Sequence, residues 1–228
     1  MGEEREYAGG TTGVPPSEKG SAVYARSTTI STDPSQVDEG IAFVRDEVLP
    51  AITAMQGCRG LSMLVDRGSG RCITTTSWDS EEALQASAET ARPLRERAVE
   101  LLGGEATVEI WEIASMHRAH HTGAGTCVRA AWSRVPTPQV ENALDFYKYR
   151  LLPQIEELDG FVSASLMIDK AAGRAVTSVA FESREAMEGT RDQADYLRAA
   201  STNEANVEFL DVCEFELAIA HLHVPELV

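Results

Sequence analysis

The sequence predicts an α+β fold in which two β-α-β-β-α-β repeats of about a hundred residues each close into one barrel. Three observations predict it. The sequence aligns with itself at a nearly constant spacing, and both copies show the same order of strand and helix patterns. In addition, a sheet with helices on one face leaves its other face apolar, so a second sheet must cover that face.

The internal duplication is the first of these observations. Residues 37–84 align with residues 140–187 without a gap at a spacing of 103, with roughly 14 identities where chance would give about three. After the second predicted helix the spacing becomes 104, which aligns EIWEIA at 109–114 with CEFELA at 213–218. The matches include Leu49-Pro50 with Leu152-Pro153, Gly57 with Gly160, Asp66 with Asp169, and Gly70-Arg71 with Gly173-Arg174.

Each copy begins with a strand and an amphipathic helix. The strand patterns are AVYARSTTI at 22–30 and TCVRAAWSRV at 126–135, and prolines that suit a helix start follow both of them. Apolar residues then recur at spacings of three and four, which predicts one buried helical stripe. The stripe consists of Val37, Ile41, Val44, Val48, Ile52 and Met55 in the first copy, and of Val140, Leu144, Tyr147, Leu151, Ile155 and Leu158 in the second.

The remainder of each copy predicts a hairpin, a second helix and a last strand. The hairpin turns are DRGSGR at 66–71 and DKAAGR at 169–174. Ser80 and Ser183 are suitable N-caps for the second helices, and the last strands are expected at 107–115 and 209–220.

These patterns divide the chain into four parts. Residues 1–20 are polar and rich in glycine and proline, which predicts a disordered leader. The first repeat is expected at 21–116, a linker at 117–125 and the second repeat at 126–228.

Composition limits the partners and the compartment. The formal net charge of −16 would repel nucleic acid and anionic membranes, so neither is an expected partner. The first residues lack the pattern of a signal peptide, and no apolar run approaches the roughly 20 residues that span a bilayer. We therefore expect a cytoplasmic protein.

The cysteines and histidines predict no metal site. Cys58, Cys72, Cys127 and Cys213 are far apart in the sequence and form no CxxC pair, so free cysteines are expected. The five histidines follow the expected last strands, where a solvated linker and tail explain them as well as a metal site does.

The element order, the D-x-x-x-G-R hairpin, WDSEEAL at 78–84 and EIWEIA at 109–114 together resemble the antibiotic-biosynthesis monooxygenase (ABM) domain. That domain belongs to the dimeric α+β barrel superfamily. The resemblance covers residues 22–220 and implies two ferredoxin-like repeats that form a fused dimeric α+β barrel. It further implies a small aromatic substrate of the phenol or quinol type, oxidised without any cofactor.

The resemblance also implies a pocket between the sheet and the helices of each half. Arg26 and Arg129 occupy equivalent places on the first strands and are the candidate catalytic residues, because a buried guanidinium could hold a phenolate. Each arginine could instead reach solvent or pair with a carboxylate. The candidate substrate-binding residues are Tyr24, Trp78, Trp111, Trp132 and Tyr147. Trp78 and Trp111 match Phe181 and Phe215, which also fits plain core packing.

A haem-degrading branch of the superfamily is disfavoured, because it uses an Asn on the first strand, which both first strands here lack. The sequence leaves open whether the protein is an enzyme. Besides a cofactor-independent monooxygenase-like protein, it fits a non-catalytic carrier of small molecules. It also fits a structural protein whose helical faces mediate homo-oligomerisation.

Overall fold

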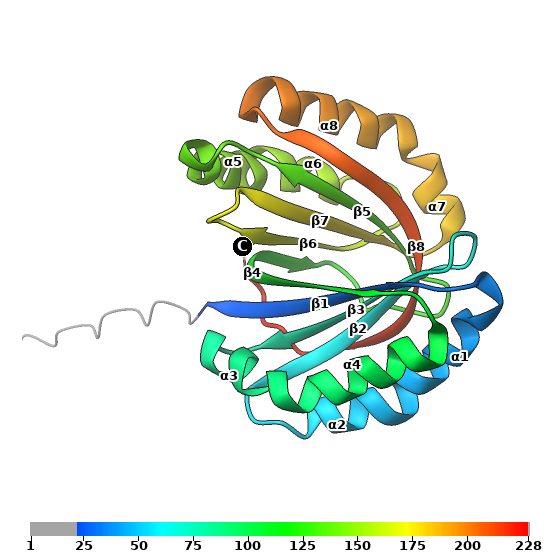
Figure 1. The fold of residues 1–228 in the computed structure, drawn as a ribbon. Coiled ribbons are helices and arrows are strands. Elements are labelled where there is room, and N and C mark those ends of the chain that lie inside the picture. Colours follow the sequence, from blue (N-terminus) through cyan, green and yellow to red (C-terminus); the bar gives the residue numbers. More distant parts are fainter. Residues whose placement is uncertain (1–21, 228) are drawn as a thin grey trace, which may run out of the picture.

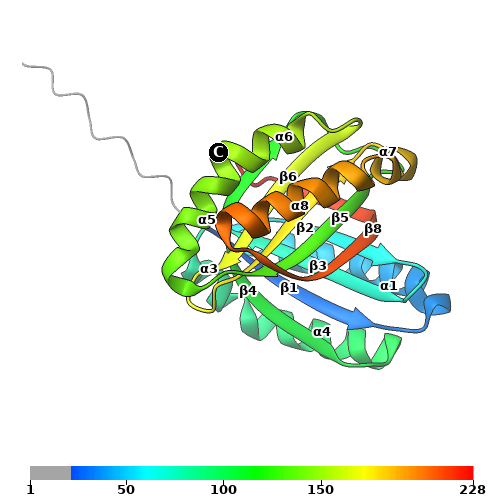
Figure 2. The same cartoon turned by 90° about the horizontal axis from the view of Figure 1, so that it is seen from above.

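The computed structural model describes residues 22–227. In this part of the chain eight antiparallel strands form a closed barrel in the order β1-β3-β2-β8-β5-β7-β6-β4, with the helices on its outside (Figures 1 and 2). The prediction of two ferredoxin-like repeats that form a fused dimeric α+β barrel is confirmed. The predicted disordered leader at 1–20 lies outside the described residues.

The two halves contain the same elements in the same order. In the first half these are β1 (Val23–Ser31), α1 (Val37–Phe43), α2 (Leu49–Thr53), β2 (Cys58–Asp66), β3 (Arg71–Trp78), α3 (Glu81–Ala86), α4 (Ala88–Leu102) and β4 (Ala106–Arg118). In the second half they are β5 (Cys127–Arg134), α5 (Val140–Phe146), α6 (Leu152–Glu156), β6 (Phe161–Asp169), β7 (Arg174–Phe181), α7 (Arg184–Gly189), α8 (Arg191–Ala205) and β8 (Glu208–Leu222).

The last strand of each half joins the two sheets. β4 pairs with β1 of its own half and then with β6, while β8 pairs with β5 and then with β2. At 13 and 15 residues, β4 and β8 are long enough to serve both neighbours. Neither sheet keeps a free edge, and the barrel is closed by main-chain hydrogen bonds.

The predicted first helix of each copy is interrupted by a π-helical turn. The turns η2 (Val44–Val48) and η4 (Tyr147–Leu151) lie immediately before the repeated Leu-Pro pair. Pro50 and Pro153 have no N–H to donate to the preceding turn and would clash with its carbonyl, and a wider turn relieves this. The repeated proline thus gives both halves the same bulge.

The predicted second helix is also broken, at Ser87 in the first half and at Thr190 in the second. The expected N-caps are confirmed: the hydroxyls of Ser80 and Ser183 accept from the main-chain N–H three residues later. The break comes where the Ser87 and Thr190 hydroxyls donate back to the carbonyls of Leu84 and Met187.

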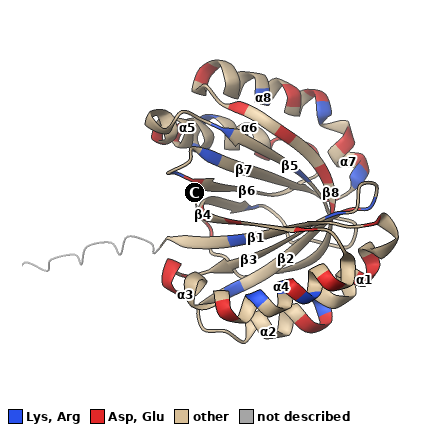
Figure 3. Cartoon of the chain, in the orientation of Figure 1, with Lys and Arg blue, Asp and Glu red and all other residues tan. Residues whose placement is uncertain are grey.

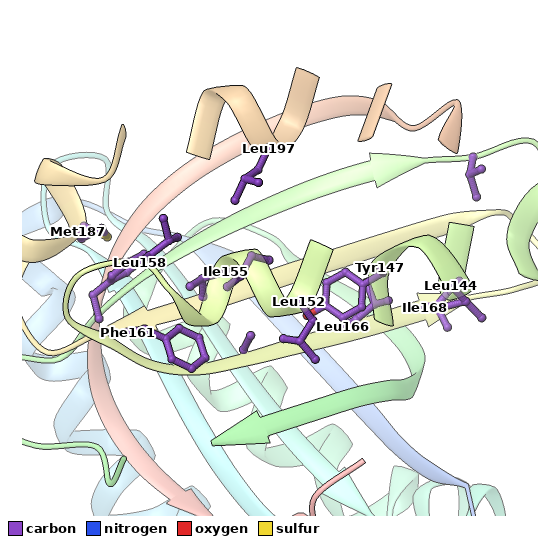
Figure 4. Close-up of a cluster of buried hydrophobic side chains, with 14 of the residues drawn as sticks. Leu144, Tyr147, Leu152, Ile155, Leu158, Phe161, Leu166, Ile168, Met187 and Leu197 are labelled. Carbon is purple, nitrogen blue, oxygen red and sulfur yellow. The ribbon is translucent and has the colours of Figure 1, made fainter. Parts of the chain in front are cut away.

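The core has two outer layers and an inner one. Figure 4 shows the second-half layer, in which Leu144, Tyr147, Ile155 and Phe161 pack between the helices and the sheet. A similar layer lies under the first-half helices. Smaller apolar clusters lie inside the barrel and include Trp111, Ile113 and Phe215. The interior, which we call the lumen, is therefore only partly filled by the core.

Charged residues lie mainly on the outside. Figure 3 shows Asp and Glu on the helices of both halves, as the net charge of −16 predicts. In the described part of the chain, no helix has the length and apolar character that crossing a membrane would require.

Candidate functional site

The lumen contains a cavity of about 330 Å³ that is lined by residues from all eight strands. Side chains alternate along each strand, so every second residue faces the lumen and the others face the helices. Ligand sites commonly have volumes of roughly 300–1,000 Å³ with apolar walls and a few polar groups. The cavity fits this description, which makes the lumen the candidate functional site.

A belt of hydroxyl groups crosses the middle of the lumen. Ser27 is paired with Thr75, and Thr75 with Ser62, on adjacent strands of the first half. In the second half Ser165 is paired with Ser178. All five line the cavity. Hydroxyls donate and accept, so the belt can bind hydroxyl or carbonyl groups of a ligand without charge.

One end of the lumen, which we call the hairpin end, is closed by two arginines that stack on tryptophans. Arg71 begins β3, pairs with Asp211 at 2.7 Å and lies 4.3 Å above the Trp132 ring. Arg174 begins β7, pairs with Glu109 and lies 5.2 Å above the Trp111 ring. Cation–π contacts of this kind add to the ion pairs and hold both ring planes. At the hairpin end, the charge of each arginine is thus neutralised by an ion pair with a carboxylate.

At the opposite end, which we call the linker end, the last strands finish and two extended segments cover the barrel. The linker, residues 119–126, hydrogen-bonds through Ala119 and His120 to the carbonyl of Val162. The tail, residues 223–227, bonds through His223 to the carbonyl of Arg59. Arg59 and Val162 are equivalent under the repeat, so the linker and the tail are equivalent segments of the two copies.

The two segments differ in what they present to the lumen. Val224 of the tail is buried in an apolar cluster with Trp111 and Met116. Its counterpart in the linker, His120, is an exposed residue that lines the cavity together with His121. The linker end is therefore apolar on the tail side and polar on the linker side.

Arg118, the last residue of β4, also lines the cavity. Its Nη1 donates to the carbonyl of Val224 at 2.8 Å and lies 3.8 Å from the Glu226 carboxylate. Its Nη2 is buried and has no hydrogen-bond partner among the described residues. A buried, unpaired charged donor is uncommon in proteins and calls for an explanation.

The predicted catalytic residues Arg26 and Arg129 face the helices and not the lumen. Arg26 donates to Ser87 Oγ and to the carbonyl of Leu84, both at 2.7 Å. Burial, with a smaller contribution from Arg95, lowers the pKa of the Arg26 guanidinium. Arg129 donates to Thr190 Oγ1 and to the carbonyl of Met187. These bonds tie each first strand to the break in the second helix, which gives both arginines a structural role. Their catalytic role stays a prediction.

The spaces between sheet and helices, where the resemblance implied the pockets, are small. The cavity beside Arg26 has a volume of about 70 Å³ and the one beside Arg129 about 60 Å³. Both are far below the roughly 300 Å³ at which ligand sites begin. Of these three cavities, only the one in the lumen reaches that volume, because the helices pack closely on the outer face of the sheet.

The five candidate substrate-binding residues fall into two groups. Trp111 and Trp132 lie inside the barrel, where Trp111 Nε1 donates to Ser27 Oγ at 2.9 Å. Tyr24 and Trp78 face the first-half helices, with Trp78 fully buried. Tyr147 packs in the second-half core, where burial, with a smaller effect of Glu156, raises its pKa (Figure 4). The structure thus brings only the first group to the lumen.

The hydroxyl belt, Arg118 and the lumen-facing histidines were not predicted from the sequence. A signal for the belt was present, since Ser62 matches Ser165 and Thr75 matches Ser178 on strands that otherwise keep apolar residues. The histidines were all placed beyond the strands, whereas β4 and β8 run through His117 and His221. Among the described residues, no group of three His, Cys, Asp or Glu side chains is arranged to hold a metal ion.

Comparison with solved structures defines the class of fold. A candidate monooxygenase from Fusobacterium nucleatum subsp. nucleatum superposes with a TM-score of 0.65 at 10% identity, over 90% of this chain and 94% of that one. An anthrone oxidase-like protein gives 0.64 at 14% identity, over 87% and 91% of the two chains. A ferredoxin-fold protein related to antibiotic biosynthesis monooxygenases from Listeria monocytogenes gives 0.50 at 10% identity, over 85% and 94%. The ABM-like dimeric α+β barrel fold is thereby established.

Sequence comparison then gives the family. The chain is 55% identical over 222 residues to the uncharacterized protein Rv2557 of Mycobacterium tuberculosis, covering 96% of this chain and 99% of that protein. It is 53% identical over 222 residues to the uncharacterized protein Rv2558 of the same organism, covering 96% and 94%. No family model matches the chain. The chain belongs to the family of Rv2557 and Rv2558.

Proposed function

We propose that the protein binds a small aromatic molecule of the phenol or quinol type in the lumen and acts on it as a cofactor-independent monooxygenase-like protein. The observation that carries this proposal is the cavity of about 330 Å³, with Trp132 in its wall and the hydroxyl belt across its middle. The aromatic wall suits a ring, and the belt suits its oxygen substituents. The ABM-like fold supports the oxygenase part of the proposal.

The lumen offers the groups that such a reaction needs. A phenol or quinol becomes a reductant of oxygen when it loses a proton, so the site must accept a proton and stabilise an oxyanion. His120 and His121 line the cavity and are open to solvent, and histidine is the side chain that most often serves as a general base. The belt hydroxyls donate to the oxyanion. We place the protein in the cytoplasm, which agrees with its four free cysteines.

A first experiment decides where the ligand binds. Phenols and hydroquinones are titrated against the intrinsic tryptophan fluorescence of the wild type and of two space-filling variants. Ser62→Phe fills the middle of the lumen and should abolish binding, whereas Ala91→Leu fills the first-half space between sheet and helices and should not. The opposite pattern would move the site to the pocket that the family resemblance implies.

A second experiment decides whether the bound molecule reacts. Oxygen uptake and product formation are followed with the ligands that bind, without added metal or flavin. Turnover that Ser62→Phe abolishes would support the oxygenase. The second candidate function is a carrier of the same ligands, which the enclosed lumen equally suits. Saturable binding without oxygen uptake across the panel would establish the carrier and contradict the oxygenase.

A further inference from the structure

We propose that the ligand of the lumen is a hydroxyaryl acid: an aromatic molecule with an acidic group that Arg118 binds at the linker end. This inference rests on the proposed function and adds the charge and the orientation of the ligand. Its starting point is the unpaired Nη2 of Arg118, which is buried at the edge of a cavity that the same side chain lines.

The contacts of Arg118 leave part of its guanidinium unused. Nη1 donates to the carbonyl of Val224, and the Glu226 carboxylate lies 3.8 Å from the same nitrogen. The second carboxylate oxygen of Glu226 accepts from the main-chain N–H of Arg118 at 3.3 Å. Nη2 has none of these partners. A guanidinium binds carboxylates best through two parallel N–H groups, so an incoming acid would complete its hydrogen bonding.

The other charges that face the lumen make this position selective. Glu109 is held by Arg174 at the hairpin end, so its carboxylate is already neutralised. His120 and His121 line the cavity together with Arg118 and can donate hydrogen bonds. Glu226 lies on the Nη1 side of Arg118 and offsets part of its charge, so Nη2 is the charged donor that is left for an anionic group, although the chain as a whole carries a net charge of −16. A local cationic site in an acidic protein distinguishes an anionic ligand from a neutral one.

The opposite side of the lumen determines where the ring lies. Trp132 and Phe215 are packed edge to face near the hairpin end, and Arg71 covers the Trp132 ring from outside. The hydroxyl belt lies between this aromatic wall and Arg118. A ligand that satisfies all three features has its ring at Trp132, a hydroxyl or carbonyl group at the belt and its acidic group at Arg118.

The test compares an acid with its own neutral amide. Affinities of 3-hydroxy-2-naphthoate, whose hydroxyl stands beside the acidic group with the second ring beyond, and of 3-hydroxy-2-naphthamide are measured by tryptophan fluorescence and calorimetry for the wild type, Arg118→Met, Arg118→Lys and Arg92→Met. Arg92 is an exposed helix residue that pairs with Glu89, so its variant removes the same charge outside the site. Circular dichroism confirms that each variant is folded.

We expect the wild type to prefer the acid. Arg118→Met should weaken acid binding at least tenfold and change amide binding less than twofold. The affinity of Arg118→Lys for the acid should lie between those of the wild type and Arg118→Met. Arg92→Met should bind both ligands as tightly as the wild type does. Equal weakening of both ligands by Arg118→Met would overturn the inference, because Arg118 would then act only through the tail. If Arg118→Met does not fold, a wild type that binds the amide as tightly as the acid overturns the inference. Binding of neither ligand to the wild type, nor of any phenol, would instead contradict the proposed function.

Discussion

The two copies of the repeat have kept the helix side of their sheets more closely than the lumen side, where the match of Ser62 with Ser165 is kept but other residues differ. On the helix side Arg26 and Arg129 make the same bonds to the helix breaks at Ser87 and Thr190. On the lumen side Thr29 stands where the second copy has Trp132, Met116 where it has Ala220, and His120 where it has Val224. The helix side holds each copy together, so the same groups are needed twice. The lumen is shared, so one binding site needs only one set of residues.

The shared side explains the shape of the cavity. Ala220, His120 and Met116 all border the cavity, and Met116 also packs with Val224 in an apolar cluster. At the linker end the tail, from the second copy, therefore contributes apolar packing, and the linker, from the first copy, contributes polar residues to the cavity lining.

The largest expected effect concerns the helix side. Arg129→Met should lower the free energy of unfolding by about 3–5 kcal/mol, because it removes a buried cation that bonds to Glu214, Thr190 and the carbonyl of Met187 and leaves Glu214 paired only with the exposed Arg191. Arg26→Met should cost about 1–3 kcal/mol, since Ile110 stands in the first copy where the second has Glu214 and the bonds of Arg26 go to Ser87 and the carbonyl of Leu84. Urea unfolding measures both. Loss of ligand turnover by Arg26→Met or Arg129→Met without loss of stability would restore their predicted catalytic role.

The next prediction compares substitutions at two equivalent positions of the linker end, Met116 in the first copy and Ala220 in the second. Met116→Ala should lower the free energy of unfolding by about 3 kcal/mol, because it removes a buried side chain that packs with Val224. Ala220→Met should leave stability nearly unchanged and weaken ligand binding about tenfold, or ~1.4 kcal/mol, by filling the border of the cavity. Unchanged ligand binding by Ala220→Met would show that the ligand neither passes Ala220 on entering the cavity nor lies against it when bound.

The pH dependence of the free energy of unfolding tests the ion pair between Arg129 and Glu214, which distinguishes Arg129 from Arg26. Hydrogen bonds from Arg191, and then from Arg129, hold the pKa of Glu214 below its usual range. A lowered folded pKa stabilises the protein above the unfolded value of about 4.3, and this stability is lost as the pH falls through the folded pKa. Glu214→Gln should therefore cost about 1 kcal/mol at pH 7. Unfolding measured down to pH 3 should show this difference shrinking below about pH 4, and a constant difference would contradict the ion pair.

The smallest expected effect is that of the histidines at the end of β4 and in the linker on stability. Replacing His117, His120 and His121 with Ala should change the free energy of unfolding by less than about 0.5 kcal/mol, because these residues are at least partly exposed to solvent. With a ligand that turns over, the same variant should lower the rate at least tenfold, because a general base contributes about 10²–10⁴-fold to such a step. An unchanged rate would show that His120 and His121 take no part in the proton transfer.

The sequence by itself determined the duplication, the order of the elements and the barrel. Its evidence was local and repeated: the apolar stripes, Leu49-Pro50 and its copy, and the N-caps Ser80 and Ser183 all report on neighbouring residues. Even so, the π-turns and the helix breaks escaped prediction. The π-turns arise where a proline lacks an N–H and would clash with a main-chain carbonyl. The helix breaks arise where side chains, one of them from a distant strand, donate to a main-chain carbonyl.

Only the tertiary structure decided where the site is. Alternation along a strand separates residues into two faces, but it does not say which face has space beside it. The helices fill one face around Arg26 and Arg129, while closing of the barrel leaves the other face around a cavity. Arg118 and His120 reach that cavity because the last strand of the first copy crosses to the second copy, a pairing between distant segments that no local pattern in the sequence specifies.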